Sequence, residues 1–231
     1  MTHDVATPAA QMPAVLFTFC DIASEDEPKF TEWYNREHMR DRILGLPGFK
    51  RGRRFVAVKG TPKYLAFYEA YNDEVFRSET YLELIRNPDP NSRYFITRFQ
   101  NTIRTIARMS ASLGEGEGAV IAVLPLTPQA GKEDVLRRAL TADVMPRLLA
   151  APGIVAVRLI ERDTNAQAPS RSGHVRQGDR TLDWALLVEA GETEDLERAA
   201  QSLLDSAALE LLGAQKPATP SIYRMLYRVS P

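Results

Sequence analysis

The same sequence pattern occurs twice in this chain of 231 residues, roughly 105 residues apart. Residues 14–22 read AVLFTFCDI, and residues 119–127 read AVIAVLPLT. The motif LPGF at 46–49 has the same offset from the motif APGI at 151–154. A period of this length is too long for a solenoid repeat and is typical of a duplicated domain. We therefore expect two copies of one structural unit.

Each copy is expected to contain the same elements in the same order. Hydrophobic alternation, turn residues and helix caps predict for the first copy a strand at 14–22, a helix from Pro28 to about Ile43, strands at 49–58 and 63–71, a helix from about Glu74 to Ile85 and a strand at 99–110. For the second copy they predict a strand at 119–126, a helix at 132–149, strands at 154–161 and 182–190, a helix at 193–212 and a strand at 221–229. The second copy also contains a polar insertion at 162–180 that the first copy lacks.

This order of elements is that of the ferredoxin-like fold, in which an antiparallel sheet has both helices on one face. The uncovered sheet faces of two copies can bury each other and close a barrel. We therefore expect an α+β fold in which two tandem ferredoxin-like βαββαβ repeats form an α+β barrel, with the sheets face to face and the helices outside. The expected divisions are a disordered tail at 1–13, an N-terminal repeat at 14–112 that is the candidate active half, a linker at 113–118 and a diverged, structural C-terminal repeat at 119–231.

Composition excludes several classes of function. The 29 basic and 30 acidic residues give a net charge of −1, which argues against a nucleic-acid partner. The single Cys20 offers no internal disulfide and no zinc site, and no apolar run approaches the ~20 residues that span a bilayer. Residues 1–13 lack the features of a secretory signal. We expect a cytoplasmic protein without a membrane partner, and the barrel allows closure within one chain or between two, with a homodimer expected.

A family resemblance rests on four segments, which read FTEWYNREH at 30–38, LPGF at 46–49, RRF at 53–55 and YLAFYE at 64–69. In this pattern the chain resembles the dimeric α+β barrel superfamily and, within it, the EthD-like proteins. The resemblance implies the fold. It leaves the reaction open, because the superfamily includes muconolactone-type isomerases, polyketide cyclases, cofactor-free monooxygenases, haem-handling enzymes and proteins without known activity. The EthD-like pattern often has proline two residues after the histidine, where this chain has Arg40.

His38 is the main candidate for a catalytic residue. On a helix it shares one apolar face with Phe30 and Tyr34, while Trp33 and Glu37 lie on the adjoining stripe. An imidazole with an ordinary pKa near ~6.5 can accept or donate a proton at neutral pH. The structural alternative is a partly buried histidine that caps the end of the helix. The sequence comparison aligns His38 with Asp143, so the second copy does not keep the histidine, and this favours the functional interpretation.

The neighbouring strands supply the other candidates. Tyr64 and Tyr68 share one side of their strand, and Arg53 on the preceding strand offers a cation for a developing oxyanion. Alternation alone does not show which side faces the barrel interior. We predict His38, Tyr68 and Arg53 as catalytic residues. The predicted substrate-binding residues are Trp33, Tyr34, Glu37, Phe17, Phe19, Asp21 and Tyr64.

Two arginines near the end of each copy have a different interpretation. Arg104 and Arg108 align with Arg224 and Arg228. Since this alignment keeps an arginine at both positions in both copies, we expect these side chains to be structural.

These residues lead to hypotheses from different classes. The first is a small-molecule enzyme that uses cofactor-free general acid/base chemistry of the isomerase, lyase, dehydratase or cyclase type on an apolar or aromatic substrate in the barrel pocket, with His38 as the acid/base. The second is a cofactor-independent monooxygenase of the EthD or antibiotic-biosynthesis type. The third is a non-catalytic ligand-binding or accessory protein. Neither a metal ion nor a cofactor is expected in any of them.

Overall fold

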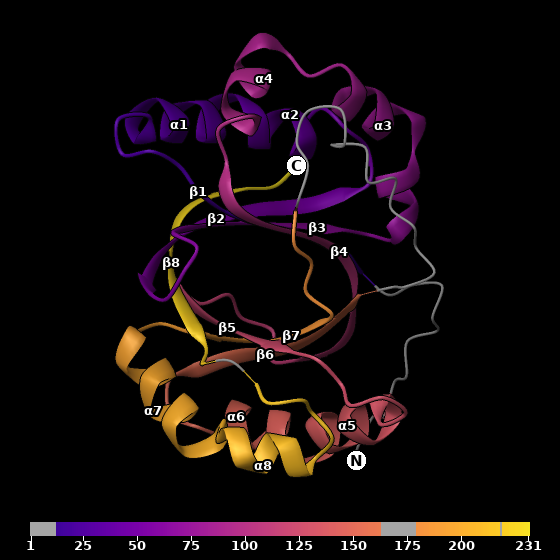
Figure 1. Cartoon of the computed structure of the whole chain (residues 1–231), viewed down its shortest axis with the longest axis vertical. Helices are drawn as coiled ribbons and strands as arrows, with labels where there is room; N and C mark the ends of the chain where they lie inside the picture. Colours follow the sequence, from indigo (N-terminus) through magenta and orange to yellow (C-terminus); the bar gives the residue numbers. More distant parts are fainter. Residues whose placement is uncertain (1–12, 163–178, 218) are drawn as a thin grey trace.

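The computed structural model describes residues 13–162, 179–217 and 219–231. Residues 1–12 of the expected tail at 1–13 and residues 163–178 of the polar insertion therefore lie outside the described residues. Eight strands form one closed antiparallel barrel in the order β1-β3-β2-β8-β5-β7-β6-β4 (Figure 1). The expected α+β fold is confirmed. The barrel closes within a single chain, so closure does not require a second subunit, and the homodimer stays a prediction.

The first repeat contains one more helix than expected. Its elements are β1 (Ala14–Asp21), α1 (Glu27–Trp33), the π-helical turn η2 (Tyr34–His38), α2 (Met39–Ile43), β2 (Phe49–Lys59), β3 (Tyr64–Ala70), the 3-10 turn η3 (Asp73–Arg77), α3 (Glu79–Arg86), α4 (Pro90–Ile96) and β4 (Gln100–Leu113). The helix expected from Glu74 to Ile85 is divided at Ser78, whose side chain caps α3. The segment after it forms α4, because the side chain of Asp89 accepts a hydrogen bond from the backbone of Ser92 and Pro90 suits the first turn.

The second repeat follows the same plan. Its elements are β5 (Val120–Leu126), α5 (Glu133–Ala139), the π-helical turn η4 (Leu140–Val144), α6 (Met145–Leu149), β6 (Ile154–Arg162), β7 (Trp184–Ala190), α7 (Thr193–Leu203), α8 (Ser206–Leu211) and β8 (Ser221–Val229). The expected helix at 193–212 is divided at Leu204, and Asp205 caps α8 by accepting a hydrogen bond from the backbone of Ala208 at 2.8 Å. None of the helices in the described part of the chain is long and apolar enough to cross a membrane.

Strand pairing shows which residues of the two repeats are equivalent. Ala14 lies opposite Ala70, the last residue of β3, and Val120 lies opposite Ala190, the last residue of β7. Ala14 is therefore equivalent to Val120. The sequence comparison had matched it with Ala119, one residue earlier, because the letters AV recur there.

The same one-residue shift applies to the first helix of each repeat. The two π-helical turns begin at Tyr34 and at Leu140 and end at His38 and at Val144. His38 is thus equivalent to Val144, and its alignment with Asp143 was wrong. The connection between α6 and β6 is one residue shorter than the connection between α2 and β2. The Pro-Gly turns of the two repeats are therefore again 105 residues apart.

The barrel interior is packed with side chains from both repeats. Its apolar cluster consists of Val15, Phe17, Phe19, Phe55, Leu65, Phe67, Ala107, Met109, Ile121, Val123, Ile160, Ala185, Leu187 and Tyr223. Beside it, Arg53 donates hydrogen bonds to Glu189 at 2.7 Å and to Glu69 at 3.3 Å, and Arg158 also bonds Glu189. These four charged side chains are buried. Aromatic rings and ion pairs of the described residues thus fill much of the barrel interior, where the substrate pocket was expected.

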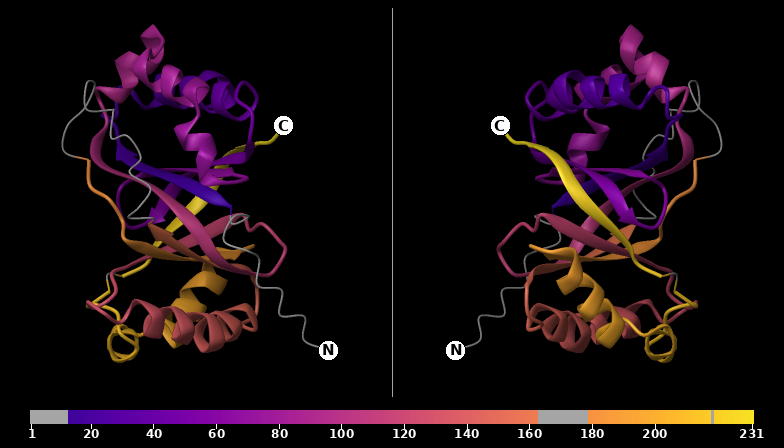
Figure 2. Two further views of the ribbon diagram at one scale, coloured as in Figure 1. Left: turned by 90° about the vertical axis from the view of Figure 1, so that its right-hand side faces the viewer. Right: turned by 90° about the vertical axis from the view of Figure 1, so that its left-hand side faces the viewer.

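The helices lie outside the barrel in two separate layers. Figure 2 shows α1–α4 covering one end of the molecule and α5–α8 covering the other. Each layer packs on the outer face of its own half of the sheet and forms its own apolar core. A space between a helical layer and the sheet is thus a second place where a ligand site can form.

Candidate active site

A cavity of about 80 Å³ lies between the sheet and the helices of the first repeat. It is lined by Thr18, Tyr34, His38, Arg42, Tyr68, Tyr81, Leu84, Ile85, Pro88, Ile96, Phe99 and Arg104. The polar members come from β1, β3, β4 and three helical segments, while the apolar members are half-buried and form the outer rim. A ligand larger than a few atoms must displace this rim.

His38 is held in this cavity by packing and by one hydrogen-bond contact. Its side chain is buried, with the ring centre 4.3 Å from that of Trp33 and 4.8 Å from that of Tyr34. Its Nδ1 atom lies 3.5 Å from the hydroxyl of Ser92 on α4. Asp89 caps the same helix by accepting a hydrogen bond from the Ser92 backbone N–H at 2.9 Å. If the Ser92 hydroxyl donates to Asp89, it accepts from the Nδ1 proton of His38, and the lone pair of Nε2 is left unprotonated.

The imidazole of His38 is neutral at physiological pH. Burial lowers its pKa well below the ordinary value of 6.5, and the positive charges of Arg42 and Arg54 lower it further. A neutral imidazole is a proton acceptor. The same environment disfavours the conjugate acid, so His38 is a weaker base than a free histidine unless negative charge develops on a ligand beside it, and it does not suit the role of a standing acid.

Two phenols lie beside the imidazole. The Tyr68 hydroxyl donates a hydrogen bond to the Tyr34 hydroxyl at 3.2 Å. Burial raises the pKa of both groups, so both stay protonated at neutral pH. With its oxygen accepting from Tyr68, Tyr34 retains its own proton for donation to a ligand.

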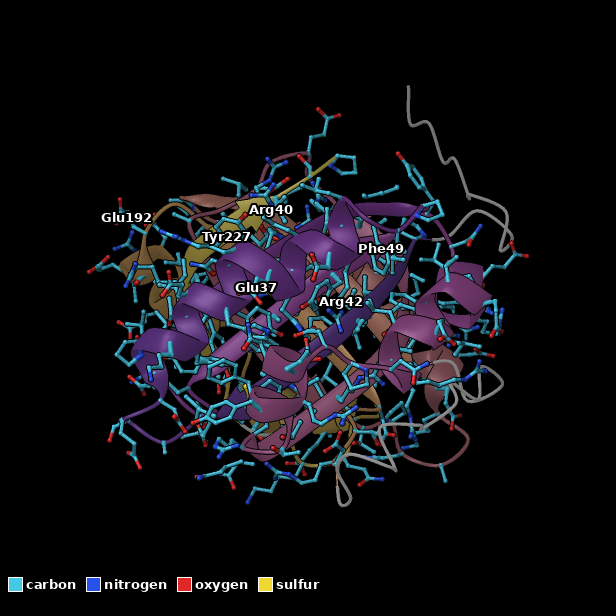
Figure 3. The ribbon with its side chains drawn as sticks, turned by 90° about the horizontal axis from the view of Figure 1, so that it is seen from above. Glu37, Arg40, Arg42, Phe49, Glu192 and Tyr227 are labelled. Atoms are coloured by element: carbon cyan, nitrogen blue, oxygen red, sulfur yellow. The ribbon has the colours of Figure 1, made fainter. Side chains whose placement is uncertain are left out.

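Two arginines complete the polar lining. Arg42 is one helical turn beyond His38, and its Nη1 atom donates to the backbone oxygen of His38 at 2.8 Å. Figure 3, which looks down on the helical layer of the first repeat, shows Arg42 and Glu37 along the same helix. Arg104 reaches the cavity from β4 and donates to the Tyr81 hydroxyl at 2.9 Å.

The structure separates part of the predicted catalytic set from His38. Arg53, Phe17 and Phe19 point into the barrel interior, on the opposite face of the sheet. Tyr68 points toward the helices and lines the cavity. The expectation that Arg53 acts beside His38 was therefore wrong in geometry, because residues 53 and 68 fall on opposite faces of neighbouring strands.

The remaining predicted binding residues surround the cavity without lining it. Trp33 is buried behind His38, and Tyr64 packs on Phe30 at 5.1 Å between ring centres. Glu37 points away and accepts a hydrogen bond from Asn91 at 3.0 Å. Asp21 lies at the end of β1, where it accepts from the backbone of Lys63 at 2.6 Å and from the side chain of Asn101 at 2.7 Å. Neither carboxylate orients the imidazole.

The second repeat shows what this space contains when no polar site is present. The residues equivalent to Thr18, Tyr34, His38, Arg42 and Tyr68 are Leu124, Leu140, Val144, Leu148 and Val188. All of these aliphatic side chains are buried in one continuous apolar core. The fold is therefore satisfied by hydrocarbon at these positions. The polar set of the first repeat needs an explanation other than folding, and a functional site provides one.

Sequence reasoning missed several members of the site. Arg42 was available from the helical period, since it continues the face of Tyr34 and His38 at the same spacing of four. Arg104 was set aside as a residue kept in both copies. The strand register places Arg104 opposite Thr18 and makes Arg108 the equivalent of Arg224. Arg104 thus has no arginine counterpart.

The fold of this chain is a closed eight-stranded α+β barrel with both halves of the barrel in one chain. No protein-family model matches its sequence, and no curated protein is matched by it. Among solved structures it is similar to an anthrone oxidase-like protein, with 14% identity, a TM-score of 0.64 and coverage of 95% of this chain and 93% of the other. It is also similar to a candidate monooxygenase from Lactobacillus acidophilus, with 7% identity, a TM-score of 0.60 and coverage of 95% and 97%. A mutant chlorite dismutase from Candidatus Nitrospira defluvii is similar as well, with 9% identity, a TM-score of 0.60 and coverage of 94% of this chain and 92% of the other. At these identities the likeness shows the fold.

Proposed function

We propose that this protein is an enzyme that removes a proton from a small apolar or aromatic substrate in the cavity of the first repeat, with His38 as the base. The observation that carries the proposal is the neutral imidazole of His38 among polar cavity residues that the second repeat replaces with aliphatic ones. The similarity to oxidase-like and monooxygenase-like folds supports an enzymatic role.

The proposed step is a simple proton transfer. A C–H or O–H bond of the substrate breaks, the proton moves to the Nε2 atom of His38, and the electron pair stays on the substrate as an enolate or phenolate. The Tyr34 hydroxyl, which Tyr68 supports through its hydrogen bond, donates to the oxygen on which this charge develops. Arg42 adds a permanent positive charge near this oxygen.

The fate of the resulting anion separates two reaction classes. Return of the proton at another position gives an isomerisation, and loss of a leaving group or closure of a ring gives the lyase or cyclase reaction. Oxygenation is the second candidate, and the likeness to an anthrone oxidase-like protein favours it. In that case an activated CH₂ group and one O₂ molecule yield a carbonyl group and one water molecule.

The decisive experiment measures the proton transfer itself. Small phenols and enolisable aromatic ketones are incubated with the protein in D₂O, and exchange of substrate C–H for deuterium is followed by NMR while an electrode records O₂ uptake. We expect exchange by the wild type and a decrease of roughly 10²-fold or more in His38→Gln, with affinity largely kept. Asp143→Asn, an exposed position in the second repeat, is the control.

Each outcome has one meaning. Exchange with O₂ uptake assigns the oxygenase reaction, and exchange without it assigns the isomerase or lyase reaction. Binding without exchange makes the protein a ligand carrier and refutes the enzymatic proposal. Equal exchange by the wild type and His38→Gln removes His38 as the base.

A further inference from the structure

We infer that the cavity binds a small ring compound that carries an oxyanion, either a carboxylate or an ionised phenol, and that Arg42 and Arg104 hold this oxyanion. The inference rests on the proposed function only in its choice of the cavity. It concerns the charge of the substrate, because the proposed proton transfer does not specify whether the bound substrate is charged.

Arg42 is a buried cation whose charge interacts with the exposed carboxylate of Asp41 without forming an ion pair. The residue is 8% exposed, and its hydrogen bond goes to the neutral backbone oxygen of His38. Among the described residues, no carboxylate forms an ion pair with it. An isolated charge is costly to bury, and proteins offset this cost by pairing it. A ligand with a negative charge supplies that partner.

Arg104 adds a second positive charge on the opposite wall. It is half-buried, and its hydrogen bond goes to the Tyr81 hydroxyl. Arg104 also forms no ion pair with a carboxylate in the described part of the chain. The cavity lining contains no Asp or Glu side chain, and burial raises the pKa of Tyr34 and Tyr68 and lowers the pKa of His38. The site thus carries two positive charges and no negative one.

Buried arginines elsewhere in the first repeat are compensated within the protein. Arg53 is paired with Glu189 and Glu69. Arg54 lacks a carboxylate, but its guanidinium lies 4.8 to 5.0 Å from the centres of three aromatic rings and donates to the side chains of Asn35 and Thr31. Arg42 and Arg104 differ from both because they border open space.

The second repeat shows that the fold does not require these two cations. Leu148 stands at the position of Arg42, and the register of β5 and β8 puts Pro220 at the position of Arg104. The apolar rim of the cavity, formed by the half-buried residues Leu84, Ile85, Pro88, Ile96 and Phe99, suits the ring of such a ligand. The two arginines lie inside the cavity and the apolar residues form its outer rim. This arrangement suits a ligand that combines an aromatic ring with an oxyanion.

Binding of three probes tests the inference. Benzoate carries a carboxylate, p-nitrophenol ionises to a coloured phenolate, and benzyl alcohol is a neutral compound of similar size. Isothermal titration at low salt is expected to show benzoate or p-nitrophenolate bound at least roughly tenfold more tightly than benzyl alcohol. Arg42→Gln and Arg104→Gln are each expected to weaken that binding by roughly 10- to 100-fold, because each removes a hydrogen bond to a charged group. Arg42→Lys is expected to retain part of it.

The control is Arg147→Gln, since Arg147 is exposed on the corresponding helix of the second repeat and pairs with Asp143. Its affinity should equal that of the wild type, and circular dichroism checks that every variant is folded. Tighter binding of benzoate assigns a carboxylate substrate, and tighter binding of p-nitrophenolate, seen by its absorbance, assigns a phenolate. Equal affinity for all three probes, or benzoate and p-nitrophenolate affinities unchanged in both Arg42→Gln and Arg104→Gln, would overturn the inference. His38→Gln should still bind the anion, so a failure of the proposed proton transfer is distinguishable from a failure of anion binding.

Discussion

The guanidinium of Arg53 lies 2.7 Å from the carboxylate of Glu189, so a side chain of the first repeat is ion-paired with one of the second inside the barrel. Both side chains are fully buried. Glu189 also accepts a hydrogen bond from the backbone of Gly118 at 3.0 Å, which ties the linker to the same group. The pair thus joins the two repeats, and it is remote from the cavity with His38.

Loss of one partner of this pair should destabilise the protein strongly. In Arg53→Met the carboxylates of Glu69 and Glu189 keep their burial and lose a cation, so we expect a decrease of about 3–5 kcal/mol in the free energy of unfolding. Urea denaturation measures it. Arg147→Gln breaks an exposed pair and should cost less than about 1 kcal/mol. A decrease below that figure in Arg53→Met would show that the buried pair does not hold the repeats together.

Removal of the hydroxyl of Ser92 should affect catalysis more than stability. Ser92→Ala removes the contact with Nδ1 of His38 but keeps the backbone N–H that Asp89 caps. Ala208 already occupies the same position after Asp205 in the second repeat, so the helix tolerates it. We expect a roughly tenfold or larger loss of deuterium exchange, with a change in unfolding free energy within about 1 kcal/mol. Ser110→Ala, on β4, is the control, and unchanged exchange in Ser92→Ala would contradict a positioning role.

Replacement of Arg42 by an apolar residue should make the free protein more stable. Arg42→Met removes a buried charge that has no ion pair among the described residues, as Leu148 does in the second repeat. We expect a gain of about 1 kcal/mol or more, because hydrophobic replacements of buried charges are often stabilising. Thermal unfolding checks the sign. Arg40→Met, exposed on the same helix, should stay within about 0.5 kcal/mol of the wild type; a clear loss in Arg42→Met would show that the cation is compensated within the fold.

Stability should fall as the pH falls below about 6.5, in part because of His38. Its pKa is lowered in the folded state by burial and by Arg42 and Arg54, while the unfolded chain has an ordinary value near ~6.5. Below that pH the unfolded state binds a proton that the folded state refuses, so the free energy of unfolding decreases by up to about 1.4 kcal/mol per pH unit until the lowered pKa is reached. Urea titrations between about pH 7.5 and pH 5 measure this decrease, and His38→Gln should show a smaller one.

The repeat in the sequence was sufficient to predict the barrel, because two βαββαβ units leave two sheet faces to be buried. It was also sufficient to find His38, Tyr34 and Tyr68. It was not sufficient to decide which sheet face carries the site. A period of two places Arg53 and Tyr68 on definite sides of their strands, but the barrel side follows only from the packing of Phe17 and its neighbours.

The register between the repeats could not be read from matching letters either. Matching placed Asp143 against His38 and Arg224 against Arg104, whereas hydrogen-bonded pairing moves both assignments. The arginine assignment moves by four residues and the His38 assignment by one, and a shift of one residue is invisible in two apolar strands that both contain alternating aliphatic residues. It decides whether the counterpart of His38 is a charged surface residue or a core valine.

Closure of the barrel within one chain allows the two halves to diverge independently. In a barrel made of two identical subunits, every substitution appears twice, so a costly cation or imidazole in one half is imposed on the other as well. Here Val144 and Leu148 contribute dense packing in one half, while His38 and Arg42 occupy the other. The fused chain can therefore keep a polar cavity in one half while the continuous apolar core of the other half contributes stability.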